Sequence, residues 1–179
     1  MIAILWYIPI YQVLIHKCNN IDNKFYGYNS LISMDLSNFN TINIENMLDM
    51  FNNCTSLKHL NLSNFDTSNV DDISSMLSNC SSLEKIDISN FNTENIIDMS
   101  NLFSGCKSLS SLELTNFNTK NVKKMASMSV DCISLTSIDI SEFNTEKLVN
   151  MENMFYKCYS LINLNNFNTK KVTNMKYNR

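Results

Sequence analysis

The chain of 179 residues is long enough for one domain, and 44% of its residues are hydrophobic, which suffices for a core. Its formal net charge is −3 and no run of basic residues occurs, so nucleic acid is not an expected partner. Asparagine occurs 30 times, whereas glycine occurs twice and proline once. Because asparagine tolerates left-handed backbone, this composition predicts a folded chain with many turns.

Residues 1–24 precede the repeats and begin with an apolar run, MIAILWYIPIYQVLIHKC. A run of about fifteen residues is short for a membrane span and nearer in length to the core of a signal peptide. A basic start and a small-residue cleavage site are missing, and Pro9 interrupts the run. Cys18 suggests a lipid anchor only weakly, because His16 and Lys17 precede it. We expect an apolar cap over the first coil or a signal remnant, and we predict no integral membrane span.

Residues 25–179 repeat one pattern every 26 residues. Cysteine, phenylalanine and threonine each return at this interval, and only the last interval shortens to 24. The columns are Cys54, Cys80, Cys106, Cys132 and Cys158; Phe39, Phe65, Phe91, Phe117, Phe143 and Phe167; and Thr41, Thr67, Thr93, Thr119, Thr145 and Thr169. Such a period predicts a single solenoid of about five coils plus a truncated last repeat.

Within each coil the hydrophobic period changes halfway. In SLEKIDIS, residues 82–89, Ile86 and Ile88 alternate with polar residues, which predicts a short strand buried on one face. After the turn NFNT, apolar residues recur at i, i+3, i+6 and i+7: Ile96, Met99, Leu102 and Phe103. This stripe predicts a short helix, capped by Thr93 or Asn95. The expected fold class is an α/β repeat, a leucine-rich-repeat-type solenoid with one short parallel strand and one short helix per coil.

The stretch FNTENIIDMSNLFSGCKSLSSLELTNF, residues 91–117, resembles the 26-residue bacterial surface protein repeat, the BspA-like branch of the leucine-rich repeats. LEKIDISNF matches the general pattern L-x-x-L-x-L, but Phe91 stands where that pattern has Asn or Cys. A phenylalanine spine is therefore expected in place of the usual asparagine ladder. The resemblance implies a curved solenoid on secreted or surface-anchored proteins, associated with adhesion and without enzymatic activity.

The cysteine column raises the question of disulfides or a shared metal. Side chains stacked in parallel point the same way, no C-x-x-C occurs, and His16 and His59 do not recur with the cysteines. Free cysteine is also a normal buried residue. We therefore predict a structural column, with no metal and no cofactor.

The polar strand residues are the best candidates for binding, because they point away from the buried side. Three successive carboxylates ~5 Å apart would repel one another unless a cation, a basic partner or water screened them. The alternative is a solvated face that keeps the sheet soluble. The candidate residues are Asp35, Asn61, Asp87, Glu113 and Asp139, with the hydroxyl-bearing Ser63, Ser89, Thr115 and Ser141 beside them.

Enzymatic activity is not expected, because a repeated column offers like environments on an open surface and no catalytic motif is present. We predict a non-catalytic recognition or adhesion module that binds a protein or glycan, on a host or a neighbouring cell, through its strand-lined face. The expected location is the cell surface or the secreted fraction. A structural spacer and an intracellular interaction scaffold are the two alternatives.

Overall fold

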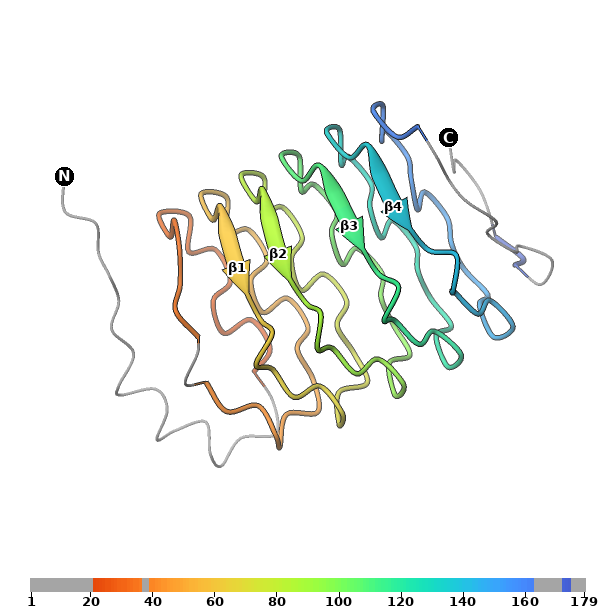
Figure 1. Ribbon diagram of the computed structural model, residues 1–179, viewed down its shortest axis with the longest axis horizontal. Coiled ribbons are helices and arrows are strands. Elements are labelled where there is room, and N and C mark those ends of the chain that lie inside the picture. Colours follow the sequence, from red (N-terminus) through yellow and green to blue (C-terminus); the bar gives the residue numbers. More distant parts are fainter. Residues whose placement is uncertain (1–20, 37–38, 163–171, 175–179) are drawn as a thin grey trace.

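In the computed structural model, residues 21–36, 39–162 and 172–174 are described, and they form one elongated stack of coils (Figure 1). Four coils carry a three-residue strand, and the strands lie side by side along one face. They are β1 (His59–Asn61), β2 (Lys85–Asp87), β3 (Ser111–Glu113) and β4 (Ser137–Asp139). The predicted repeat fold, with short parallel strands spaced 26 residues apart, is confirmed for these four coils.

The strands pair in parallel with the register that the period demands. β1 pairs with β2, so that Leu60 faces Ile86, and β3 pairs with β4, so that Leu112 faces Ile138. Residues at equal positions in successive coils therefore lie beside one another. β2 and β3, however, belong to separate two-stranded sheets.

The predicted helix in each coil is wrong, because no residue of the described ranges is helical. The apolar stripe is nevertheless buried: Ile96, Met99 and Phe103 are 0% exposed. Asn101, between Met99 and Phe103, has a φ of 57°, and Gly105, two residues after Phe103, has a φ of 71°; both lie in the left-handed region. A right-handed helix cannot pass through such residues. The segment instead forms a chain of turns that buries the residues a helix would bury.

The left-handed residues recur in every described coil, in two columns that are four residues apart. The first column has φ values from 53° to 57° and the second from 59° to 73°. Asparagine, aspartate and glycine, which adopt this conformation most readily, supply most positions. The columns are Asn23, Asp49, Ser75, Asn101, Ser127 and Asn153, and Gly27, Asn53, Asn79, Gly105, Asp131 and Lys157.

The side of the stack opposite the strands, residues 96–106 and their equivalents, is called the return side. In its turns, backbone N–H groups donate alternately to a carbonyl of their own coil and to a carbonyl of the next coil. The Asn101 N–H donates to Ala126 O in the next coil, whereas the Leu102 N–H donates to Met99 O in its own turn. The bridges between coils run without a break through the column Asn46, Asp72, Asp98, Lys124, Asn150 and Asn174. Pairing across coils thus takes the place of the i to i−4 bonds of a helix.

The core lies between the strands and the return side. The phenylalanines from Phe39 to Phe143 are all buried, and neighbouring rings stack with centroids 5.6 Å apart for Phe39 and Phe65 and 6.4 Å apart for Phe91 and Phe117. Burying such side chains stabilises the fold by about 1.5–3 kcal/mol each.

An asparagine ladder accompanies the aromatic column, contrary to the expectation that phenylalanine replaces it. The Asn90 side-chain amide donates to Ser63 O, and that of Asn116 donates to Ser89 O, each in the preceding coil. These asparagines stand one residue before the phenylalanines. The threonines and asparagines expected to cap a helix also bond between coils: Thr93 Oγ1 donates to Asn118 O, and the Asn95 amide donates to Ser68 O.

Most of the apolar segment predicted over residues 1–24 lies outside the described residues, and so does much of the last repeat. Ile21 is 3% exposed, and its N–H donates to Asn46 O in the next coil. Residue 21 is therefore already part of the stack. Within the described ranges, no helix has the length and hydrophobicity needed to cross a membrane.

Candidate functional site

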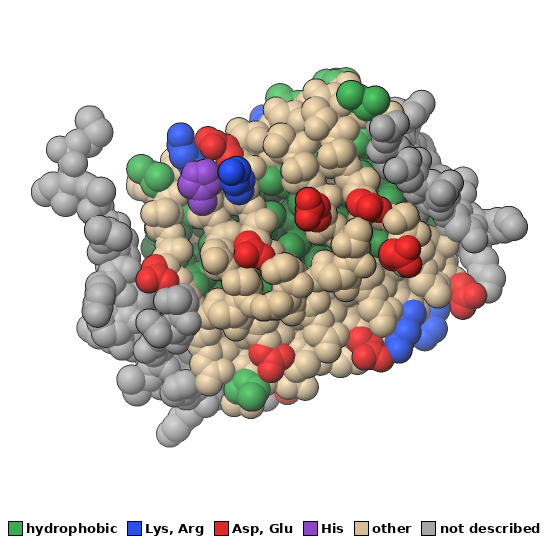
Figure 2. Space-filling model, in the orientation of Figure 1, with side chains coloured by type: hydrophobic (Ala, Val, Ile, Leu, Met, Phe, Trp, Pro, Cys, Tyr) green, Lys and Arg blue, Asp and Glu red, His purple; other side chains and the backbone are tan. Residues whose placement is uncertain are grey.

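The outward side chains of β1–β4 and of the residues just after them form what we call the strand face. Alternation places Leu60, Leu112 and Ile138 in the core and their polar neighbours outside. Acidic side chains are spread over this face in Figure 2. Eight of the nine predicted binding residues are exposed and Ser63 is half-buried: Asp35, Asn61, Asp87, Glu113, Asp139, Ser63, Ser89, Thr115 and Ser141.

The aspartates of this column are tied to serines of their own coil. Asp87 Oδ1 accepts hydrogen bonds from the Ser89 hydroxyl at 2.7 Å and from the Ser89 N–H at 3.1 Å. Asp139 Oδ1 accepts the same two bonds from Ser141, at 2.8 and 3.0 Å. These Asx turns shape the bend that follows each strand. The bonds leave the second oxygen of each carboxylate outside the turn.

The hydrogen bonds from serine lower the pKa of both aspartates. For Asp87 the main cause is the Ser89 hydroxyl, and for Asp139 it is the Ser141 N–H. Asn61 makes the same pair of bonds with Ser63, at 2.7 and 2.9 Å, and carries no charge. The turn therefore needs an oxygen acceptor at this position and no negative charge.

The predicted row of three carboxylates is interrupted. Glu113 lies opposite Asp139 in the paired sheet, and Asp87 lies opposite Asn61, but Asp87 and Glu113 have no paired register between them. Glu113 has one more methylene than aspartate, and Thr115 stands where the neighbouring coils have serine; within the described residues no hydrogen bond joins the two side chains. Its carboxylate makes no hydrogen bond or ion pair within the described part of the chain.

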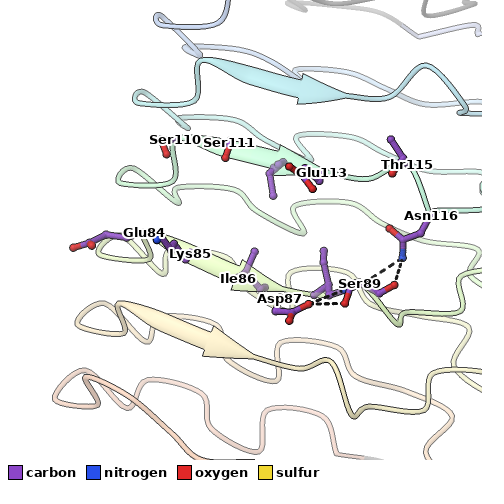
Figure 3. Close-up of a pocket in the computed structure, with 12 residues that line it drawn as sticks. Glu84, Lys85, Ile86, Asp87, Ser89, Ser110, Ser111, Glu113, Thr115 and Asn116 are labelled. Carbon is purple, nitrogen blue, oxygen red and sulfur yellow. Dashed lines mark hydrogen bonds between the residues drawn. The ribbon is translucent and has the colours of Figure 1, made fainter.

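A cleft of about 450 Å³ opens between β2 and β3. Figure 1 shows these two strands further apart than β1 and β2, and Figure 3 shows the residues that line the opening. Ile86 lies in it and is half-buried, whereas the equivalent residues of β1, β3 and β4 are at most 4% exposed. Asp87 lines one side and Glu113 the other, with Ser111 and Thr115 beside them.

Missing backbone bonds explain the opening. Just before β1, β2 and β4, an N–H of one coil donates to a carbonyl of the preceding coil, as from Glu84 to Lys58 O and from Thr136 to Ser110 O. Among the described residues, the equivalent bond from Ser110 to Glu84 O is absent. Because β2 and β3 do not pair, their facing edges have no strand partner among the described residues.

A second hydrogen bond between these two coils is missing in the turn after the strand. Thr41, Thr67 and Thr119 each accept an N–H from the next coil, at 2.7–2.8 Å. The same bond to Thr93 is absent among the described residues, and its hydroxyl donates to Asn118 O at 3.2 Å. Two hydrogen bonds that other junctions have are thus missing between the coils of β2 and β3, whereas the Asn116 amide still donates to Ser89 O across this junction.

Sequence reasoning identified Asp87, Glu113, Ser89 and Thr115 but missed the cleft between them. It also missed Ile86, which the period assigns to the core, and Ser111 on the outward side of β3. The two coils fit the same repeat pattern as their neighbours, so the sequence carries no signal of the break.

The cysteines form a structural column, as predicted. Cys54, Cys80, Cys106 and Cys132 are fully buried, and each thiol donates to a carbonyl of the preceding coil at 3.0–3.2 Å. Burial raises the pKa of Cys54 to about 11, so its thiol is protonated at neutral pH and is a poor nucleophile. Within the described residues, no group of His, Cys, Asp and Glu side chains could hold a metal ion.

Comparison with known proteins identifies a family. The sequence profile described as "Mycoplasma protein of unknown function, DUF285" matches residues 9–86 and 83–178. A solved structure, "Crystal structure of T. pallidum Leucine Rich Repeat protein (TpLRR)", is similar over 80% of this chain and 71% of its own, with 18% sequence identity and a TM-score of 0.40. No curated protein sequence matches the chain.

Proposed function

Because the chain belongs to the DUF285 family, whose description assigns no activity, we propose its function from its own geometry: a non-catalytic module that recognises a protein partner through the strand face. The observation that carries this proposal is the acidic cleft between β2 and β3, a concave part of the strand face where apolar and charged groups meet. Glycan binding is the second candidate, supported by the hydroxyl column beside the carboxylates.

Two further features support recognition over catalysis. The carboxylates of Asp87 and Asp139 have a lowered pKa, so they are ionised at neutral pH and poor proton donors. The cysteine thiols are buried and already donate hydrogen bonds to backbone carbonyls. The ionised carboxylates and polar side chains of the strand face can attract cations and form hydrogen bonds.

The resemblance to the BspA-like repeats leads us to place this recognition at the cell surface or in the secreted fraction, as part of adhesion. The competing proposals are a spacer that only holds another part away from a surface and an intracellular scaffold. Cell fractionation separates the intracellular proposal from the other two, because only those two require export.

A binding screen with the folded protein against proteins and glycans tests the proposal directly. Partners found there are measured again with the triple variant Asp87→Asn, Glu113→Gln and Asp139→Asn, which keeps shape and removes charge. The matched control removes three exposed carboxylates outside the strand face, Glu45→Gln, Asp71→Asn and Glu146→Gln. We expect affinity to fall about tenfold or more in the first variant only. Equal affinity for both variants would show that the strand face is not the binding surface.

A further inference from the structure

The cleft between β2 and β3 combines three features that a solvated strand face lacks. It is hollow, with a volume of about 450 Å³. Ile86 is exposed to it, although every equivalent strand residue is buried. The facing edges of both strands are also unpaired among the described residues, and no backbone N–H there donates to Glu84 O. An occupant must therefore be apolar along part of its length and polar at its tip.

The charges around the cleft favour a cation at one end. Asp87 and Glu113 lie on its two sides toward the carboxyl ends of the strands (Figure 3). Neither makes an ion pair within the described residues. At the opposite end, Lys85 would repel a cation, and Glu84 is already paired with Lys58 at 3.6 Å.

Figure 2 shows the same arrangement at the surface, with hydrophobic side chains at the floor of a hollow in the middle of the face and acidic side chains on both sides. A cationic side chain with a long aliphatic stem fits both parts, because the stem packs on an apolar surface while the head keeps polar contacts. Lysine and arginine share this shape and differ in the head.

The cleft offers acceptors in several directions, which favours arginine. The second carboxylate oxygen of Asp87 lies outside its turn, Glu113 contributes two oxygens, and the strand edges add carbonyl groups. A guanidinium carries five N–H donors in a plane and is more weakly hydrated than an ammonium, which has three. A guanidinium can therefore bond to acceptors that lie in several directions, and it loses less hydration free energy when it leaves water.

We infer that the cleft between β2 and β3 receives an arginine side chain of a protein partner, with its stem on Ile86 and its guanidinium between Asp87 and Glu113. This inference rests on the proposed function, because it requires a partner on the strand face. It goes further by naming the chemical group that binds and the coil junction where it binds.

The test is a titration of the ¹⁵N-labelled protein with three blocked peptides, Ac-Gly-Arg-Gly-NH₂ and its lysine and citrulline counterparts, followed by NMR. Citrulline matches arginine in shape but has no charge. We expect saturable shifts for the arginine peptide within residues 84–89 and 110–116, and affinity about tenfold lower for citrulline, since a hydrogen bond to a charged group is about twice as strong. The lysine peptide should fall between the two.

Two variants locate the site. Asp87→Asn with Glu113→Gln should weaken the arginine peptide about tenfold, whereas Asp71→Asn, which removes an exposed carboxylate outside the strand face, should leave its affinity unchanged. Asn61 makes the same turn bonds as Asp87, so the asparagine should keep the fold, and thermal unfolding verifies this.

Four results would overturn the inference: equal binding of arginine and citrulline, equal binding of arginine and lysine, shifts that survive the double variant, or shifts that vanish with Asp71→Asn. Its failure is distinguishable from that of the proposed function. If the arginine peptide leaves the cleft unperturbed while a partner still needs the strand-face carboxylates, only the arginine inference is wrong. If no partner needs that face, the proposed function fails as well.

Discussion

The two sides of the solenoid hold successive coils together in different ways. On the return side, bridges run from Asn46 to Asn174 through every described coil. On the strand side, pairing stops between β2 and β3 and resumes between β3 and β4. The return side is held by backbone bonds at each left-handed turn, whereas the strand side has three-residue ladders that can be lost with little backbone change. Among the described residues, the turns therefore link the coils without a break, whereas the pairing of the strands is interrupted once.

The coils of β2 and β3 lie close together at the corner where the return side turns toward the strands, at Asn79 and Gly105. A Cβ on Gly105 would lie 2.6 Å from Asn79 Oδ1 and 3.3 Å from Asn79 Cα. The bond from the Asn79 N–H to Ser104 O is 2.6 Å long, against 2.8 Å for the equivalent bond of Asn53. The coils of β2 and β3 thus approach closely at this corner and diverge at the strands, which gives the junction the shape of a wedge.

The largest effect is expected from Phe91→Ala, because this ring stacks on Phe117 across the wedge and is 4% exposed. Loss of a buried ring between coils that cannot close should lower the free energy of unfolding by about 3–5 kcal/mol. Urea titrations followed by circular dichroism measure it. Superimposed curves of variant and wild type would contradict the aromatic contact. A second transition in the variant would show that the junction then separates the two halves.

The tight corner predicts a difference between the two glycines. Gly27 and Gly105 have φ values of 73° and 71°, but a Cβ on Gly27 would meet no atom within 4 Å. Gly27→Ala should therefore cost only backbone strain, about 1 kcal/mol, and Gly105→Ala about 2–3 kcal/mol, since Asn79 must also move. Thermal unfolding of both variants checks this order. Equal losses would contradict the close approach at the wedge.

The repeated columns could be predicted because each residue in them meets its own equivalents in the next coil. Burial of phenylalanine and cysteine and the outward column with Asp87 followed from the period alone. The helix was wrong because its stripe, i, i+3, i+6 and i+7, is also the spacing of stacked turns. Asn101 and Gly105 are residues that favour left-handed backbone, and they could have predicted the turns. Ser75 and Ser127, at positions equivalent to Asn101, obscure this pattern.

No feature of the sequence predicted the cleft between β2 and β3. Lys85, Ile86 and Asp87 fit the strand pattern as well as His59, Leu60 and Asn61 do. A break in pairing depends on small shifts of whole coils, and a periodic sequence describes only what the coils share. Candidate residues were therefore predictable as a column, whereas their grouping into a concave site was not.

The threonine column gives a smaller test of the same asymmetry. Thr67 both donates to Asn92 O and accepts the Asn92 N–H, whereas Thr93 only donates to Asn118 O. Thr67→Val should lower the free energy of unfolding by about 1–3 kcal/mol, because the part-buried N–H of Asn92 loses its partner. Thr93→Val should cost about 0.5–1.5 kcal/mol. Chemical denaturation of both variants measures the difference, and a larger loss for Thr93→Val would contradict the weaker junction.

The smallest expected effect is electrostatic and compares Asp87, beside the cleft, with Asp139, away from it. Hydrogen bonds from serine hold the pKa of each below the ordinary value of 3.8. A lowered pKa in the folded state means that the stabilisation is present above the unfolded-state pKa and is lost as the pH falls through the folded-state value.

Each aspartate should therefore add slightly to stability at neutral pH and nothing in strong acid, and solvent screening keeps this contribution small. Asp87→Asn and Asp139→Asn should each have a slightly lower unfolding midpoint than wild type at pH 7, and their midpoints should converge with that of wild type near pH 2. Asn61, which makes the same bonds without charge, sets the expected behaviour of both variants. Midpoints recorded across this pH range check the prediction. If the curve of Asp87→Asn departs from that of Asp139→Asn, the open junction alters the electrostatics of its own carboxylate, and the two halves of the strand face cannot be treated as equivalent.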